Sequence, residues 1–241
     1  MPSGIVEREI AGTIEGISKA FGRGVSFPPI VSQHGETLHN LHSDGVLQNG
    51  RLLLCDAGAE GLSYYCSDHT RTYPVSGKFT QKQKDIYNIV LAAHDRVAAM
   101  IAPHMPYMDI HNASYRILAE GLISLGLMRG TAEDAVAAGA MTLFMPHGLG
   151  HGMGLDVHDC AKARAELYQG ALLEPGMVFT IEPGLYFRAD DLLVPEEYRG
   201  IGVRIEDDVV VNADGTVTRI SEDIPRTIAD VEEWIASIQS R

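Results

Sequence analysis

Two stretches of sequence decide the fold: Leu52-Leu53-Leu54-Cys55-Asp56-Ala57-Gly58 and Ser67-Asp68-His69-Thr70-Arg71-Thr72. The first is an apolar run that delivers an aspartate, and the second delivers another after a turn near Gly61. The two aspartates are 12 positions apart, so a regular hairpin centred on residue 62 would place them opposite each other on one face. Carboxylates that close repel each other unless a cation lies between them. By itself the hairpin fits a cation site and an ordinary pair of solvated and turn aspartates equally well.

Composition limits the classes of partner. The 241 residues, 45% of them apolar, are enough for one large domain, which we expect to span residues 1–241. The net charge of −13 disfavours nucleic acid and anionic membranes as partners. We find no apolar run long enough for a membrane span and no signal peptide in the first 25 residues. Cys55, Cys66 and Cys160 follow no disulfide pattern, so we expect a reducing, cytoplasmic location.

Apolar spacing and capping signals predict the helices and strands. We expect helices over residues 5–19, from 81 to about 101 after a capping box at Thr80, and over 109–127. Thr131 and Thr227 each open a further helix. Strands are expected at 30–31, 177–182 and 202–211. The mixture of hairpins and helices predicts an α+β domain.

A second hairpin repeats the acidic pattern. Glu182 and Glu206 are 24 positions apart and would face each other across a turn at Val194-Pro195. Arg204 shares the face of Glu206, because side chains alternate with a period of two along a strand. Each half of the chain therefore carries one carboxylate hairpin, which suggests an internal structural repeat.

Histidines cluster in the stretch from Pro146 to Asp159, which contains His147, His151 and His158 and has four glycines at alternate positions from 148 to 154. Those glycines allow the backbone to approach a ligand or another strand closely. Either His151 or His158 would bind a metal ion while the other faces the substrate, and His147 would line the same cleft. His39, in a polar loop, is by itself more typical of an ordinary residue than of a catalytic one.

Four carboxylates with an imidazole suit a pair of divalent first-row cations. Such ions can lie about 3.5–4 Å apart and turn a shared water into a nucleophile, which is the chemistry of hydrolysis. A mononuclear site or a calcium-type structural site is the alternative, although histidine disfavours calcium. No cysteine has the spacing of a structural zinc ligand. We expect Arg71 and Arg204 to pair with the ligand carboxylates.

Six ordered motifs carry a family resemblance. They are Leu54-Cys55-Asp56-Ala57-Gly58-Ala59, Ser67-Asp68-His69-Thr70-Arg71-Thr72-Tyr73-Pro74, His147-Gly148-Leu149-Gly150-His151, Leu155-Asp156-Val157-His158-Asp159, Glu174-Pro175-Gly176-Met177 with Thr180-Ile181-Glu182-Pro183-Gly184, and Gly202-Val203-Arg204-Ile205-Glu206-Asp207. The chain resembles the catalytic domain of the M24-type metallopeptidases, which include Xaa-Pro aminopeptidase (aminopeptidase P), prolidase and methionine aminopeptidase. The resemblance implies the pita-bread fold, in which helices cover a curved antiparallel sheet built from two pseudo-repeated halves.

The resemblance also implies the metal ligands. Asp56 would bind one ion, Asp68 and Glu206 would bridge both, and His151 and Glu182 would complete the second site. The family metal is commonly manganese, with cobalt or zinc in some members.

The resemblance implies roles in catalysis and substrate binding too. Glu182 would handle the proton of the attacking water, and His158 would stabilise the tetrahedral intermediate. His39, with a catalytic role as well, would shape the substrate pocket together with His147 and His158. Arg204 would support the bridging carboxylate from behind the ligands.

The segment Pro195–Asp208 looks most like Xaa-Pro aminopeptidase, with prolidase next and methionine aminopeptidase a poorer fit. The resemblance therefore implies an exopeptidase that releases an N-terminal residue, from Xaa-Pro peptides, by attack of a metal-bridging hydroxide. Prolidase activity is the alternative. A non-catalytic peptide-binding module and a metal-free, creatinase-type hydrolase are disfavoured, because all five ligand positions are intact.

Some features depart from the family pattern. The usual N-terminal domain and first catalytic-domain helix have no counterpart before Gly4, so we expect an exposed apolar patch on the sheet. Control of substrate length and any homo-oligomer would also depend on that missing part. The loop Gln33–Glu36 and Asn40, where Tyr is frequent, alter the substrate side.

Overall fold

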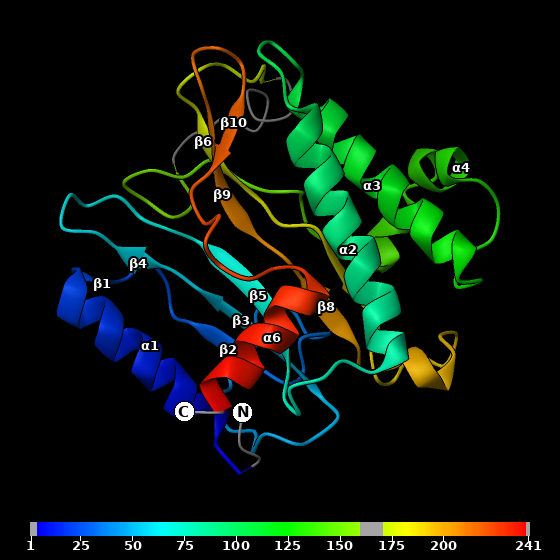
Figure 1. Ribbon diagram of the computed structural model, residues 1–241. Coiled ribbons are helices and arrows are strands. Elements are labelled where there is room, and N and C mark those ends of the chain that lie inside the picture. Colours follow the sequence, from blue (N-terminus) through cyan, green and yellow to red (C-terminus); the bar gives the residue numbers. More distant parts are fainter. Residues whose placement is uncertain (1–3, 160–170, 240–241) are drawn as a thin grey trace.

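The computed structural model describes residues 4–159 and 171–239 (Figure 1). Cys160, one of the three cysteines that follow no disulfide pattern, lies outside the described residues. The helices are α1 Glu7–Phe21, α2 Gln81–Met100, α3 Tyr107–Ser124, α4 Ala132–Ala137 and α6 Ile228–Gln239, with 3-10 turns at Ala140–Leu143 and Glu196–Tyr198. Each expected helix is confirmed, with ends that shift by a few residues. The capping box is present as well, because Thr80 and Gln83 exchange hydrogen bonds at the start of α2.

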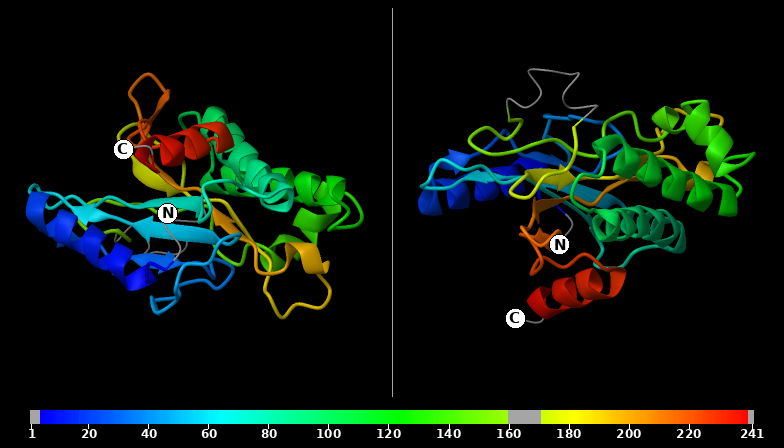
Figure 2. Two further views of the ribbon diagram at one scale, coloured as in Figure 1. Left: turned by 60° about the horizontal axis from the view of Figure 1, so that its bottom comes forward. Right: turned by 90° about the horizontal axis from the view of Figure 1, so that it is seen from above.

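The strands form antiparallel ladders. They are β1 Gly24–Val25, β2 Ile30–Ser32, β3 Leu52–Ala57, β4 Ala59–Glu60, β5 His69–Pro74, β6 Val178–Ile181, β7 Gly184–Tyr186, β8 Gly202–Arg204, β9 Asp207–Val211 and β10 Val217–Arg219. The ladders have the orders β2-β3-β5, β10-β9-β6, β7-β8 and β1-β4. Contacts of β8 with β3 and β5 join the two halves. Helices cover the strands: α1 runs along β1 and β2, while α2 packs on α3 and α6 (Figures 1 and 2).

The register of the first hairpin differs from the expected one, and the residue opposite Asp56 is two positions further along the chain. Asp56 of β3 lies opposite Thr70 of β5, so the hairpin centre is residue 63 instead of 62. Asp68 still shares the face of Asp56, but as a diagonal neighbour and not as the opposite residue. The turn sets this register, because Gly61 donates its N–H to the carbonyl of Tyr65 and Glu60 pairs with Cys66, so the hairpin is centred on residue 63. The same register continues past Gly58, where the strands are so close that an added Cβ would lie 1.7 Å from the carbonyl oxygen of Ser67. Beyond Gly58 the chain forms β4, which pairs with β1.

The second hairpin has the expected register but not the expected strands. Ile181 pairs with Asp207 and Gly184 with Arg204, a shared register that sets Glu182 opposite Glu206. Both sides of the ladder are interrupted there, so the single strand expected over 202–211 is two strands. At the break Glu206 donates its N–H to Thr70 of β5, and Glu182 donates its N–H to Leu149. The interruption therefore joins the Glu206 backbone to the first hairpin and the Glu182 backbone to the glycine-rich loop that carries His151.

The apolar patch expected on the sheet is not found among the described residues. Their exposed large apolar side chains belong to helices and loops, for example Phe21 at the end of α1 and Leu193 in the loop before β8. The helix α1 provides the cover, because Ala11 is buried against Val31 and Leu53. No helix in residues 4–159 or 171–239 has the length and apolarity that a bilayer crossing requires.

Candidate metal centre

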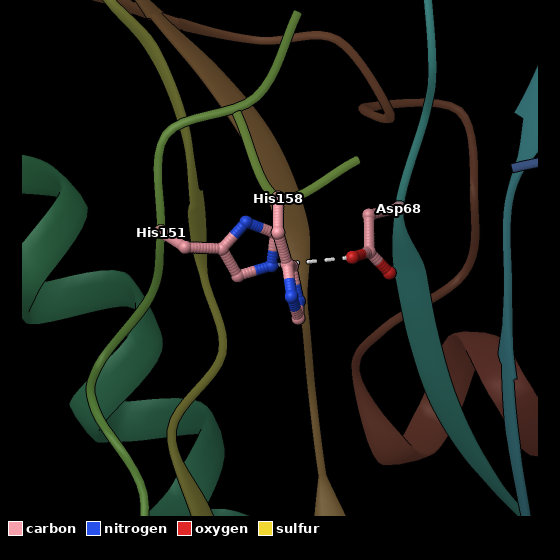
Figure 3. Close-up of side chains that lie close together, drawn as sticks. All are labelled: Asp68, His151 and His158. Atoms are coloured by element: carbon pink, nitrogen blue, oxygen red, sulfur yellow. Dashed lines mark ion pairs between the residues drawn. The ribbon is translucent and has the colours of Figure 1, made fainter. Parts of the chain in front are cut away.

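The five expected metal ligands converge between the two hairpins. Three overlapping groups have ligand atoms that all lie within 4.8 Å of one another: Asp56, Asp68 and Glu206; His151, Glu182 and Glu206; and Asp68, His151 and His158. Asp68 enters from the start of β5, and both histidines enter from the loop after residue 150 (Figure 3). The groups share members, so the ligand atoms form one continuous cluster and not separate sites.

The glycine-rich loop is held against β6 by backbone hydrogen bonds. Thr180 donates its N–H to the carbonyl of His151, and Glu182 donates to that of Leu149. The loop and β6 approach so closely that a Cβ at Gly150 would lie 1.8 Å from the carbonyl oxygen of Thr180. The glycine at this position thus serves approach to another strand, and it sets His151 beside Glu182.

The His151 ring is oriented for binding through Nε2. Its Nδ1 lies 3.2 Å from the carbonyl oxygen of Gly152, whereas Nε2 lies 3.3 Å from an oxygen of Asp68 and 3.7 Å from one of Glu182. A carbonyl partner on one ring nitrogen fixes the tautomer and frees the other nitrogen for a metal. The neighbouring carboxylates favour the protonated ring and raise the pKa of His151 against the effect of burial.

The carboxylates of the cluster are crowded and buried. Burial, followed by the charges of Glu182, Asp68 and Asp56, raises the pKa of Glu206 well above its usual value. Burial raises the pKa of Asp56 as well, and that of Glu182 to about 7. Oδ1 of Asp56 is buried without a hydrogen-bond partner among the described residues. Divalent cations would neutralise this charge and satisfy that oxygen, so the residues present fit a metal pair.

A hydrogen-bonded chain of buried side chains supports the cluster. Arg204 makes an ion pair with Asp56 and donates to the hydroxyls of Thr70 and Tyr186, each at 3.0 Å. Thr70 in turn donates to Glu206 at 2.6 Å. Arg204 therefore contacts one ligand directly and reaches the carboxylate expected to bridge only through Thr70. Thr70 and Tyr186 were missed from sequence, although the period of two places them on the faces of Asp68 and Glu182.

Arg71 does not pair with a ligand, and that expectation is wrong. Its guanidinium makes an ion pair of 2.6 Å with Asp207, on the opposite face of the strands. Alternation along β5 explains the difference, because residue 71 is an odd number of positions from Asp68.

A cavity of about 610 Å³ opens over the cluster. Its polar floor consists of the five ligands with Arg204, and His39, His147 and His158 also line it. The apolar side was not foreseen from sequence. It is formed by Phe27, Pro28, Ile30, Leu38, Leu41 and Val157.

The three further histidines differ in their surroundings. His147 lies 2.8 Å from the Tyr186 hydroxyl through Nε2, and burial lowers its pKa to about 4. His158 is exposed, with its ring edge-on to His151 at 4.2 Å between centroids. His39 is exposed and has a φ of 52°, a conformation that residues other than glycine rarely adopt. Such strain is often retained where a side chain has a functional position.

Known proteins resemble the chain over nearly all of its length. Xaa-Pro aminopeptidase 1 of Streptomyces coelicolor is 48% identical over 235 residues, which cover 97% of this chain and 48% of the relative. The Xaa-Pro aminopeptidase of Escherichia coli is 40% identical over 215 residues, or 88% of this chain and 48% of that protein. The chain thus spans about half the length of these relatives.

Solved structures of aminopeptidase P also resemble the chain over nearly all of its length. The structure of Pseudomonas aeruginosa aminopeptidase PepP matches with a TM-score of 0.93 and 36% identity, and covers 99% of this chain and 54% of that one. A variant of Escherichia coli aminopeptidase P in complex with substrate matches with a TM-score of 0.92 and 35% identity over 99% of this chain and 54% of that chain. These relatives share the pita-bread fold expected from the motifs. The model of metallopeptidase family M24 matches residues 1–213, and the chain belongs to that family.

Proposed function

We propose that this chain is the catalytic part of a two-metal exopeptidase that releases the N-terminal residue from Xaa-Pro peptides. The observation that carries the proposal is the convergence of Asp56, Asp68, His151, Glu182 and Glu206 on the floor of one cavity. The relatives named Xaa-Pro aminopeptidase support the choice of reaction and favour it over prolidase activity. Manganese is the proposed metal, with cobalt or zinc as alternatives.

The ligands come from the two hairpins and from the loop that carries His151. Asp56 would hold one ion, His151 and Glu182 the other, and Asp68 and Glu206 both. A pair of divalent ions lowers the pKa of a shared water, so that it can act as a nucleophile near neutral pH. Asp68 and Glu206 come from different halves of the chain, so the bridging position exists only when both hairpins are folded together.

Glu182 is proposed to accept the proton of the attacking water. Its carboxylate borders the cavity, and a carboxylate kept ionised by bound cations could accept a proton from a water beside it. His158, on the exposed rim beside His151, would donate a hydrogen bond to the oxygen of the scissile bond.

The other two histidines would position the peptide. The lowered pKa of His147 keeps its ring neutral at pH 7, so it can contact a proline ring and a carbonyl without adding charge. His39 borders the cavity beside the apolar side chains of Leu38 and Leu41. The cavity therefore offers polar groups to the peptide backbone and an apolar wall to a side chain.

The test measures release of the first residue from an Xaa-Pro-Yaa tripeptide after chelation, with and without added manganese. Manganese-dependent release is the expected result. An Xaa-Pro dipeptide measured in parallel would be the better substrate of a prolidase.

The control variant is Asp68→Ala, which removes a carboxylate expected to touch both ions. It should lose manganese binding and hydrolysis together, while circular dichroism shows a folded chain. Hydrolysis by chelated Asp68→Ala at the wild-type rate would exclude the two-metal account. A wild-type chain that binds no manganese and cleaves neither peptide would favour a peptide-binding module on the same fold.

A further inference from the structure

The ladder break at Glu206 leaves its carbonyl oxygen without a strand partner, and Arg71 supplies one. Nη1 of Arg71 donates to the carbonyl of Glu206 at 2.7 Å and to that of Thr70 at 3.0 Å. Thr70 also accepts the N–H of Glu206. One guanidinium therefore joins β5 to the interrupted strand at the residue that carries a proposed bridging carboxylate.

The same arginine is anchored in a buried charged network. Its Nη2 pairs with Asp207, which also lies 3.1 Å from Nε2 of His94 and accepts a hydrogen bond from Ser221. Arg71, Asp207 and His94 are at most 3% exposed. Burying an arginine is costly unless its donors and charge are satisfied, so this degree of satisfaction fixes the guanidinium in one orientation.

Glu206 is consequently held from both faces of the strands. On the side of the cavity its carboxylate accepts from the Thr70 hydroxyl, and on the other side its backbone accepts from Arg71. Asp68 has a comparable hold, because its backbone N–H donates to the buried carboxylate of Asp208 at 3.1 Å. The two residues after Glu206 thus anchor the backbones of both proposed bridging ligands, Asp207 through Arg71 and Asp208 directly.

Part of this network lies after the region that the family model matches, which ends at residue 213. Ser221 binds Asp207, and the carbonyl of Pro225 accepts from Nε of Arg71 at 3.2 Å. The segment is tied to α2, where the buried Tyr87 donates its hydroxyl to the carbonyl of Arg226.

We propose that Arg71, held by Asp207 and the segment 221–226, is a positioning residue that sets the distance between the carboxylates of Asp68 and Glu206. It would do so from the opposite face, without contact to metal or peptide. This inference rests on the proposed two-metal function. It predicts that metal affinity depends on the geometry of the guanidinium and not only on its charge.

The test compares Arg71→Lys with the wild-type chain. Lysine keeps the charge beside Asp207, but its single ammonium nitrogen has three donors and cannot replace the four contacts that the guanidinium makes to Asp207 and three carbonyls. Manganese binding to the chelated protein is measured by calorimetry, together with the electron paramagnetic resonance signal of spin-coupled manganese. We expect binding at one or both sites to weaken about 10–100-fold and the coupled signal to be lost, as for other residues that orient metal ligands.

Arg219→Lys is the matched control. Arg219 of β10 makes an ion pair of 2.9 Å with Asp95, and among the described residues it has no hydrogen bond or ion pair with Asp68 or Glu206. It should keep the wild-type manganese affinity. The thermal midpoint of each chelated protein is measured as well, because a purely structural role would lower that midpoint and leave the affinity of the folded chain unchanged.

The outcomes separate the inference from the function on which it rests. Wild-type affinity and a coupled signal in folded Arg71→Lys would overturn the positioning role and leave the two-metal function intact. A wild-type chain without manganese binding would overturn both. If Arg71→Lys does not fold, the double variant Arg71→Met with Asp207→Leu, which leaves neither member of that pair stranded as a buried charge, is judged by the same two readouts.

Discussion

His158 is the cavity residue for which geometry allows two roles. A ring nitrogen of His158 lies within 4.8 Å of the ligand atoms of Asp68 and His151, close enough for all three to bind one ion. The side chain is nevertheless exposed at the rim of the cavity. The other histidine of the pair is buried, with Nε2 turned to two carboxylates. Burial and ligand count favour His151 as the metal ligand, and exposure favours His158 as the group that meets the peptide.

Replacement of His158 by alanine distinguishes the two roles. We expect two manganese ions to remain bound, while kcat on an Xaa-Pro-Yaa peptide falls about 100–1,000-fold, the usual loss for one donor to a developing oxyanion. Calorimetry and steady-state kinetics measure the two quantities. His42→Ala, an exposed histidine of the neighbouring loop, serves as the control and should change neither. Loss of one metal ion in His158→Ala would instead identify this residue as a ligand.

At the scale of elements, strand breaks and close backbone contacts place the ligands. The hairpins stop being regular at Gly58 and at Glu206, and the loop bearing His151 is pressed against β6 at Gly150. In a regular ladder the backbone groups at these positions would bond within one hairpin. The interruption at Glu206 instead lets Glu206 bond to β5 and Glu182 to the histidine loop, which brings the three segments together.

Gly150→Ala tests the contact between the loop and β6. A Cβ placed 1.8 Å from the carbonyl oxygen of Thr180 requires the two segments to separate, which should cost about 1–3 kcal/mol of stability. The same movement would take His151 away from Glu182 and weaken manganese binding. Chemical denaturation and calorimetry measure these effects.

Gly148→Ala is the matched control, since its added Cβ would have no neighbour closer than 3.7 Å. It should retain the wild-type stability and metal affinity. Equal losses in both variants would mean that the glycines matter for loop flexibility and not for the approach to β6.

At the scale of the whole molecule, folding concentrates acidic groups that prefer to be neutral. Burial raises the pKa of Glu182 to about 7 and that of Asp208 to about 8, from ordinary values of 4.5 and 3.8. The pKa of His151 is raised too, mainly by Asp68 and Glu182 against burial. The folded chain therefore binds more protons than the unfolded chain just above neutral pH.

The sign of the pH dependence follows from this difference. When the folded state binds more protons, the free energy of unfolding falls as pH rises, by about 1.4 kcal/mol per pH unit for each extra proton. Histidines with a lowered pKa, such as His147, make stability rise with pH, but only below about pH 6.5, where a histidine of the unfolded chain binds a proton. They do not oppose the trend above that pH. We expect the thermal midpoint of the chelated protein to fall between about pH 7 and 8.5.

Bound manganese should reduce this fall, because cations favour the ionised carboxylates. Scanning calorimetry of chelated and manganese-loaded protein at both pH values provides the measurement. Glu182→Gln should flatten the dependence of the chelated protein. A midpoint that rises over this interval in the chelated wild type would contradict the assignment of raised pKa values.

The sequence by itself determined the elements and the identity of the ligand candidates. Helices and strands follow from the spacing of apolar residues over a few positions. The cap at Thr80 follows from the glutamine three residues later, Gln83. Parity along a strand placed Asp68 on the face of Asp56 and Glu182 opposite Glu206 without knowledge of the fold. These features depend on local geometry, which a linear pattern records.

Only the tertiary structure decided how the halves meet. Three features join residues that are far apart in the chain. They are the ion pair of Arg71 with Asp207, the contacts that hold Glu206 from both faces, and the apolar wall of the cavity. The split strand at Glu206 has a similar origin, because the ladder is interrupted where Glu206 and Glu182 find hydrogen-bond partners outside their own hairpin. Long-range packing selects those partners, and no local period encodes it.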